Sequence, residues 1–229
     1  MKKISILSIP GLPNGLLSLD SKFYHDYESI LEVIQEVEKA EEEDIFFQAY
    51  VWPKEVEHPR YQWACKIPSA AAPIYYGLYN HDAEFRGKIV NRAIEYVKNA
   101  MDESDRVYFI LHSHGNRVAF DAIRKMKQKG QIPEGKELII LSFAPAYKNV
   151  ARGWLLPGID DEDVREIEGL VKFILNFRVR TDMLSGKPPL EHYDLFEPKW
   201  YEVGWMGHAT VRNREDVMQK LREELEGRL

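Results

Sequence analysis

The chain has 229 residues, and its composition excludes several classes of protein. Apolar residues make up 45% and aromatic residues 12%, which excludes a disordered chain and suffices for one α/β domain with a sizeable core. The formal net charge of −6, without a long basic run, argues against nucleic acid as a partner. A single cysteine, Cys65, cannot form an internal disulfide and suits a reducing compartment, so we expect a cytoplasmic protein.

The N-terminal apolar run predicts a buried strand rather than a secretion signal. Ile4 to Ile9 follows two lysines, as a signal peptide would, but the proline- and glycine-containing stretch 10–15 interrupts it early, and no A-x-A-like cleavage site follows. No segment approaches the roughly 20 apolar residues that a membrane span needs. We therefore expect no secretion and no transmembrane segment.

Strands and helices alternate along the rest of the chain. The predicted strands are Ile4 to Ile9, Ile45 to Val51, Arg106 to Leu111, Leu138 to Phe143 and Val171 to Val179. The predicted helices are Phe23 to Glu43, an apolar stripe from Phe85 to Met101, a stripe from Val118 to Met126 that Gly130 ends, and Arg214 to Glu226. Apolar strands separated by helices predict an α/β fold of three layers, with a mostly parallel central sheet and helices on both faces.

Two segments do not fit this alternation, and we expect them to be irregular insertions in one domain that covers residues 1–229. The first, 52–82, is rich in tryptophan and tyrosine; the second, 144–168, holds Trp154 and Leu155 ahead of the acidic run Asp160 to Asp163. Because long loops in compact domains are often functional, Trp154 and Leu155 of the second segment are predicted to contact substrate. The alternative is that the aromatic residues only cap the sheet edge. The acidic run is expected to be the solvated start of a helix.

A serine stands where the third predicted strand meets the next helix. The strand Arg106 to Leu111 leads into His112-Ser113-His114-Gly115, and an amphipathic run follows at once. Strand, serine on a sharp turn and helix form the layout of a nucleophile elbow, which lifts a hydroxyl above a parallel sheet. The crowded turn needs small neighbours, and Gly115 supplies one. Ser113 is therefore the predicted nucleophile; the alternative is an ordinary helix N-cap.

A serine nucleophile needs a histidine base and a carboxylate that orients the base, and both follow in the chain. Asp182 comes directly after the fifth predicted strand, with Asp194 as the alternative acid. His208 lies in a glycine-flanked loop before the last helix, with His192 as the alternative base. Serine, acid and then histidine is the order found on this architecture.

With this elbow and this order of residues, the chain resembles the α/β-hydrolase superfamily, in particular its small lipase- and esterase-like members whose elbow reads H-S-H-G or H-S-x-G. The resemblance spans nearly the whole chain and implies a triad of Ser113, Asp182 and His208 that needs no metal and no organic cofactor. It also implies that the segment 144–168, which follows the strand after the elbow, is a lid over the site. The chain departs from the family at Leu111 and Asn116, where glycines are frequent.

Acyl transfer also requires N–H donors for the developing oxyanion. One donor is predicted to be the backbone N–H of His114, just after the nucleophile. The second is predicted in the loop 10–15, where Gly11 permits close approach to the substrate and Leu12 donates, because Pro13 has no N–H. The alternative for this loop is an ordinary tight turn.

These residues predict a serine hydrolase that cleaves a carboxylic ester of a small-molecule or lipid-like substrate through an acyl-enzyme on Ser113. One alternative is a non-catalytic binding module on a hydrolase scaffold. Another is a metal-dependent hydrolase, because His112-x-His114 is similar to the first two ligands of metallo-β-lactamase-like enzymes. In those enzymes an aspartate and a histidine follow, whereas this chain has Asn116 and Arg117.

Overall fold

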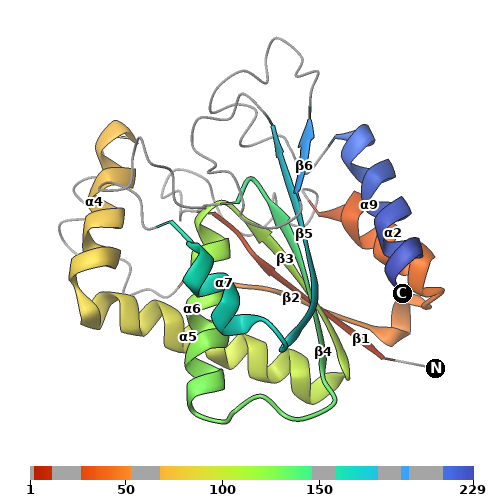
Figure 1. Ribbon diagram of the computed structural model, residues 1–229, viewed down its shortest axis with the longest axis horizontal. Coiled ribbons are helices and arrows are strands. Elements are labelled where there is room, and N and C mark those ends of the chain that lie inside the picture. The colour runs from red at the N-terminus through yellow and green to blue at the C-terminus, as the bar shows by residue number, and fades with distance from the viewer. Residues whose placement is uncertain (1–2, 12–26, 53–67, 146–157, 180–191, 196–213) are drawn as a thin grey trace.

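The computed structural model describes residues 3–11, 27–52, 68–145, 158–179, 192–195 and 214–229. Within them, a six-stranded sheet has the order β2-β1-β3-β4-β5-β6, and every neighbouring pair is parallel (Figure 1). The strands are β1 (Ile4–Ile9), β2 (Ile45–Ala49), β3 (Arg106–His112), β4 (Glu137–Phe143), β5 (Val171–Val179) and β6 (His192–Leu195).

The central strand β3 is buried on both faces, which explains its uninterrupted apolar sequence. Alternate side chains point to opposite faces of a strand, so Phe109 and Leu111 enter one core while Tyr108 and Ile110 enter the other. Leu111, two residues before Ser113, is fully buried in the first of these cores.

Helices cover both faces of the sheet and complete the three layers (Figure 1). The Phe109 face packs against α4 (Pro68–His81), α5 (Ala83–Glu103), α6 (His114–Gln128) and α7 (Asp161–Ile167). The opposite face packs against α2 (Glu28–Glu38) and α9 (Glu215–Arg228). The predicted three-layer α/β fold with a parallel sheet is therefore confirmed. In the described part of the chain, every helix is too short or too polar to cross a bilayer.

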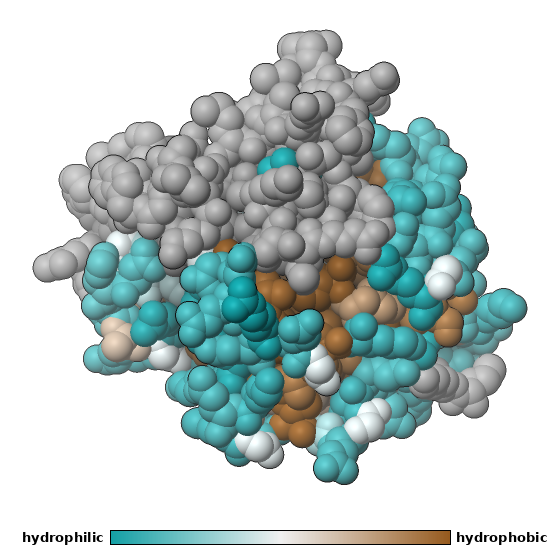
Figure 2. Space-filling view, in the orientation of Figure 1, coloured by the Kyte–Doolittle hydropathy of each residue, from teal (hydrophilic) through white to brown (hydrophobic). Residues whose placement is uncertain are grey.

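The remaining surface of the sheet is visible between the two helical layers. In the space-filling view, hydrophilic residues cover α7 and α9, and apolar residues gather between them over β5 (Figure 2). Val171, Phe173 and Ile174 of β5 are each partly buried against one of the two cores. In this view, the apolar residues over β5 are therefore the least covered apolar part of the sheet, and they lie between α7 on one face and α9 on the other.

Several predicted boundaries and one predicted segment are wrong. The helix expected at Phe23 to Glu43 ends at Glu38 in the structure, because Lys39 adopts a left-handed φ of 53° and a short 3-10 helix, η1 (Glu42–Asp44), follows. The stretch 52–82 is not irregular throughout, since α4 occupies its last part. Strand β6 was not predicted. The acidic run does begin a helix, α7, but Asp163 in it is buried rather than solvated.

Candidate active site

Ser113 lies on the turn between β3 and α6, at the carboxyl edge of the central strand. Its backbone has φ 51° and ψ −125°, a region that residues other than glycine rarely adopt. Such a conformation costs on the order of 1–3 kcal/mol and persists only when the surroundings impose it. Ser113 occupies the N-cap position of α6, yet its side chain makes no capping hydrogen bond, so capping does not account for this conformation.

Hydrogen bonds fix the Ser113 residue on both sides of its Cα. Its N–H donates to the carbonyl oxygen of Phe143 at the end of β4, over 3.1 Å. Its carbonyl oxygen accepts from the backbone N–H of Asn116 over 3.1 Å and from the side-chain amide of Asn116 over 3.0 Å. The amide oxygen of Asn116 in turn accepts from Ser142 Oγ over 2.5 Å, and both of these side chains are buried.

Gly115 lets the first turn of α6 pack directly on the end of β1. A Cβ on this residue would lie 2.2 Å from the carbonyl oxygen of Ile9 and 2.5 Å from that of Pro10. No side chain fits at such distances, and the atoms that would have to move belong to the backbone. The prediction that Gly115 supplies the small residue needed after the serine is confirmed.

Gly11, in the loop after β1, lies against the elbow. A Cβ on Gly11 would lie 3.2 Å from Ser113 Cβ and 3.2 Å from His112 Nδ1. The structure thus brings Gly11, a predicted substrate-binding residue, next to the predicted nucleophile. His114 is the first residue of α6, and the first N–H groups of a helix have no acceptor within the helix. Leu12 lies outside the described residues.

The side chain of His114 is enclosed in aromatic rings on the α4 side of the sheet. It is fully buried, with its ring centroid 4.6 Å from that of Tyr79, 5.1 Å from Tyr75, 5.2 Å from Tyr76 and 6.5 Å from Trp52. The three tyrosine rings stand edge-on to the imidazole, and the tryptophan ring is stacked with it. These aromatic residues of the stretch 52–82 therefore belong to the core and pack on the elbow helix.

Neither imidazole nitrogen of His114 has a hydrogen-bond partner among the residues that the structure describes. Burial, and to a smaller extent the positive charge of Arg117, lowers the pKa of His114 to about 3. The imidazole is therefore neutral at physiological pH and stays so well into the acidic range. His114 is suited to fixing the backbone after the nucleophile, and the prediction gave its side chain no part in proton transfer.

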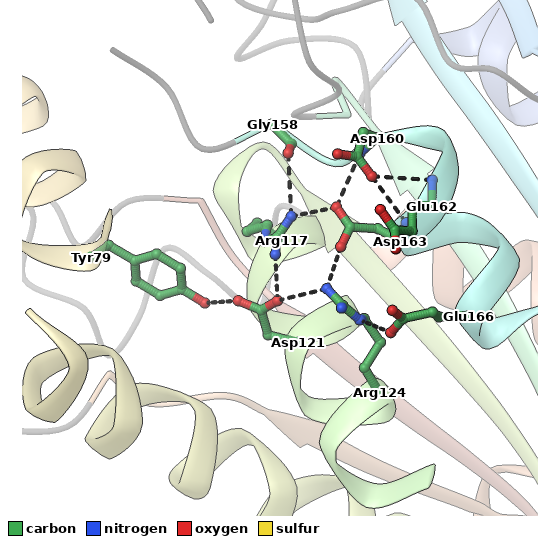
Figure 3. A network of polar contacts seen from close by, with 9 residues as sticks. All are labelled: Tyr79, Arg117, Asp121, Arg124, Gly158, Asp160, Glu162, Asp163 and Glu166. Atoms are coloured by element: carbon green, nitrogen blue, oxygen red, sulfur yellow. Dashed lines mark hydrogen bonds and ion pairs between the residues drawn. The ribbon is translucent and has the colours of Figure 1, made fainter. Parts of the chain in front are cut away.

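Arg117, one turn after Ser113 along α6, starts a network of partly buried ion pairs (Figure 3). Its guanidinium contacts the carboxylates of Asp121 at 2.7 Å and Asp163 at 2.5 Å, and it donates to the carbonyl oxygen of Gly158 over 3.2 Å. Burial alone would lower the pKa of Arg117, but the two carboxylates more than offset this and raise it. The chain that enters α7 is thereby tied to the elbow helix.

The same network extends to α4 and along α7 (Figure 3). Arg124 pairs with both Asp163 and Glu166 of α7. The hydroxyl of Tyr79 donates to Asp121 over 2.7 Å, and burial followed by the Asp121 charge raises its pKa, so it remains a donor. Since the Tyr79 ring also packs on the His114 imidazole, the network and the aromatic cluster form one continuous support behind the elbow.

Four other predicted site residues, Asp182, His208, Trp154 and Leu155, lie outside the described residues. The alternative acid Asp194 lies in β6, in register with Arg178 of β5. The alternative base, at position 192, pairs with position 176 of β5 in the same ladder. Both alternatives therefore stand in a strand rather than in a loop.

Sequence reasoning missed three residues that support Ser113: Asn116, Ser142 and Tyr79. Asn116 was noted only as a departure from glycine, although a buried amide one turn after a strained residue is a suitable hydrogen-bond donor. Ser142 carried a weak signal, since it is a polar residue inside an apolar strand. Nothing in the sequence pairs Tyr79 with Asp121, which is far from it along the chain.

Among the described residues, no group of three or more His, Cys, Asp or Glu side chains is close enough together to hold a metal ion. No protein-family model matches the chain, and neither the curated proteins nor the solved structures include a significant match to it. Function must therefore be argued from the chain's own residues.

Proposed function

We propose that this protein is a serine hydrolase of the α/β-hydrolase kind, which cleaves a carboxylic ester through an acyl-enzyme on Ser113. The observation that carries the proposal is the backbone of Ser113, a non-glycine residue held at φ 51° at the carboxyl edge of the central parallel strand, directly before a helix. A strained, over-determined serine at this position is what a nucleophile elbow requires. A binding module would gain nothing from this strain.

In the proposed reaction, Ser113 Oγ attacks the ester carbonyl carbon while His208 accepts the hydroxyl proton and Asp182 orients the imidazole. The oxyanion accepts hydrogen bonds from the N–H groups of His114 and Leu12. Collapse breaks the bond to the leaving oxygen, which takes the proton from His208 and departs as the alcohol. Water, deprotonated by the same histidine, then releases the carboxylic acid and restores Ser113.

The tyrosine- and tryptophan-rich segments support an ester with an apolar acyl or alkyl group as the substrate. No step of the proposed reaction requires a metal or an organic cofactor. The single cysteine supports the cytoplasm as the compartment.

The test is labelling with a fluorophosphonate, which phosphonylates only an activated serine, followed by peptide mass spectrometry to locate the adduct. We expect one adduct, on Ser113. Ser113→Ala should abolish labelling, whereas Ser29→Ala, a matched change at an exposed serine of α2, should leave it intact.

The base is tested by a second pair of variants. His208→Ala should lower labelling and ester turnover by several orders of magnitude, and His192→Ala should leave both near wild type. The reverse result would mean that His192, and not His208, is the base. Absence of labelling in a well-folded wild-type protein would favour the binding module instead.

A further inference from the structure

The carbonyl oxygen of Ser113 receives two hydrogen bonds from a single residue, Asn116. The backbone N–H of Asn116 supplies one of them, a bond of the 3-10 type at 3.1 Å. The side-chain amide adds a second, at 3.0 Å, from the position where the resembled family frequently has glycine. The Asn116 side chain is fully buried, so this amide has been desolvated to reach a carbonyl group that already had a partner.

Ser142 fixes which way the Asn116 amide faces. Its hydroxyl donates to Asn116 Oδ1 over 2.5 Å, and it belongs to β4, where it is in register with Leu111 of β3. With Oδ1 held by Ser142, the NH2 group must face the Ser113 carbonyl oxygen. The opposite orientation would set two oxygens against each other, since a carbonyl cannot donate.

We propose that Asn116 is a positioning residue for the nucleophile and that Ser142 acts through it. The hydrogen bonds from Ser142 to Asn116 and from Asn116 to the Ser113 carbonyl connect the neighbouring strand to the elbow. They hold the peptide after Ser113, and with it the ψ of −125° that accompanies the φ of 51°. That same peptide carries the N–H of His114, so the pair also sets the direction of the proposed oxyanion donor.

This inference rests on the proposed function, because positioning has a meaning only if Ser113 reacts. The experiment must separate positioning from simple stability. Removing one partner of a buried hydrogen bond leaves the other unsatisfied, whereas replacing both by apolar groups of similar shape is nearly neutral for folding. The informative variant is therefore the double change Asn116→Leu with Ser142→Ala, compared with each single change and with Asn91→Leu at an exposed position of α5.

The readouts are the second-order rate of fluorophosphonate labelling, kcat and KM for a soluble ester, and the urea midpoint of each variant. We expect the double variant to fold with a midpoint near that of wild type and to be labelled about a hundredfold more slowly, the loss that a misplacement of about 1 Å produces. The loss should appear in kcat with KM unchanged. Asn116→Leu alone should react as slowly as the double variant, because Ser142 acts only through Asn116. Ser142→Ala should be slowed as well.

Three results would overturn the proposal, and they are distinguishable. If wild type is labelled at Ser113 and the folded double variant reacts at the same rate, positioning by Asn116 is wrong while the proposed function stands. If the double variant does not fold, Ser142→Ala decides in its place, and an unchanged rate there overturns the inference. If wild type itself is not labelled, the proposed function fails and this inference fails with it.

Discussion

Acidification should destabilise this protein through one identifiable side chain, His114. The imidazole is fully buried among aromatic rings, and its pKa is lowered to about 3, whereas an unfolded chain holds histidine at 6.5. As the pH falls below 6.5, the unfolded state binds a proton that the native state excludes. The contribution of neutral His114 to the free energy of unfolding is therefore fully present above pH 6.5 and is lost as the pH falls from 6.5 to about 3.

The size of the loss follows from the two pKa values. Over the full gap between the two pKa values, proton linkage at about 1.36 kcal/mol per pKa unit gives a loss of about 5 kcal/mol. Between pH 7.5 and pH 5, where most carboxylates are still ionised in both states, the loss is about 2 kcal/mol. Glu137, whose pKa is lowered to about 2 mainly by its hydrogen bond to Arg106, adds an acid-sensitive contribution only at lower pH.

The assay is urea unfolding followed by tryptophan fluorescence at pH 7.5 and pH 5, for wild type, His114→Phe and His81→Gln. Phenylalanine keeps a ring among the surrounding rings and removes the titrating group. His81 is an exposed histidine of α4 and serves as the matched control. Wild type and His81→Gln should each lose about 2 kcal/mol on acidification, and His114→Phe should lose much less. An equal loss in all three proteins would refute the assignment of this pH dependence to His114.

Three further predictions concern the elbow, the network and the reaction. Gly115→Ala should lower the free energy of unfolding by about 3 kcal/mol or more, because the added Cβ would lie 2.2 and 2.5 Å from backbone oxygens. The control Gly87→Ala, in open space within α5, should raise it by about 1 kcal/mol. Equal urea midpoints for the two variants would contradict the close packing at Gly115. Asp163→Ala removes the buried carboxylate that Arg117 and Arg124 share and should lower the free energy of unfolding by about 2 kcal/mol. The exposed Asp161→Ala should lower it by less than about 0.5 kcal/mol. Ester turnover should fall on acidification as the His208 base is protonated, and a profile that stays flat down to about pH 4 would exclude a histidine base.

The sheet could be predicted because its inner strands are buried on both faces. Predominantly apolar runs such as Ile4–Ile9 and Val171–Val179 favour strands, and the observed strands coincide with them. The inward stripe of α5, which includes Phe85, Ile89 and Val97, was also predicted correctly from its helical spacing.

The features that sequence reasoning missed depend on contacts across the chain or on mixed local signals. Helix α4 contains Pro73 in its interior, which disfavours a continuous helix, and its apolar residues do not form a single stripe. The burial of Asp163 depends on two arginines of α6 that no local pattern connects with it. Strand β6 has only four residues, too few to produce a recognisable alternation.

The strain at Ser113 gives a final test of whether the fold maintains this residue for chemistry. Its conformation is imposed from three directions: by β4 through Phe143, by the end of β1 through the close approach at Gly115, and by Asn116 within α6. Glycine adopts a φ of 51° without steric cost, whereas alanine and serine share the strain.

Ser113→Gly should therefore have a free energy of unfolding about 1 kcal/mol higher than that of Ser113→Ala. This figure already allows for the greater freedom of glycine in the unfolded chain. Neither variant should be labelled by the fluorophosphonate. Urea unfolding of the two variants and wild type measures the difference. If glycine brought no gain over alanine, the backbone at Ser113 would not be strained, and the observation that carries the proposed function would lose its force. A gain together with complete loss of labelling would mean that the fold gives up stability at this one position to hold a hydroxyl above the sheet, which is the trade expected at a reacting residue.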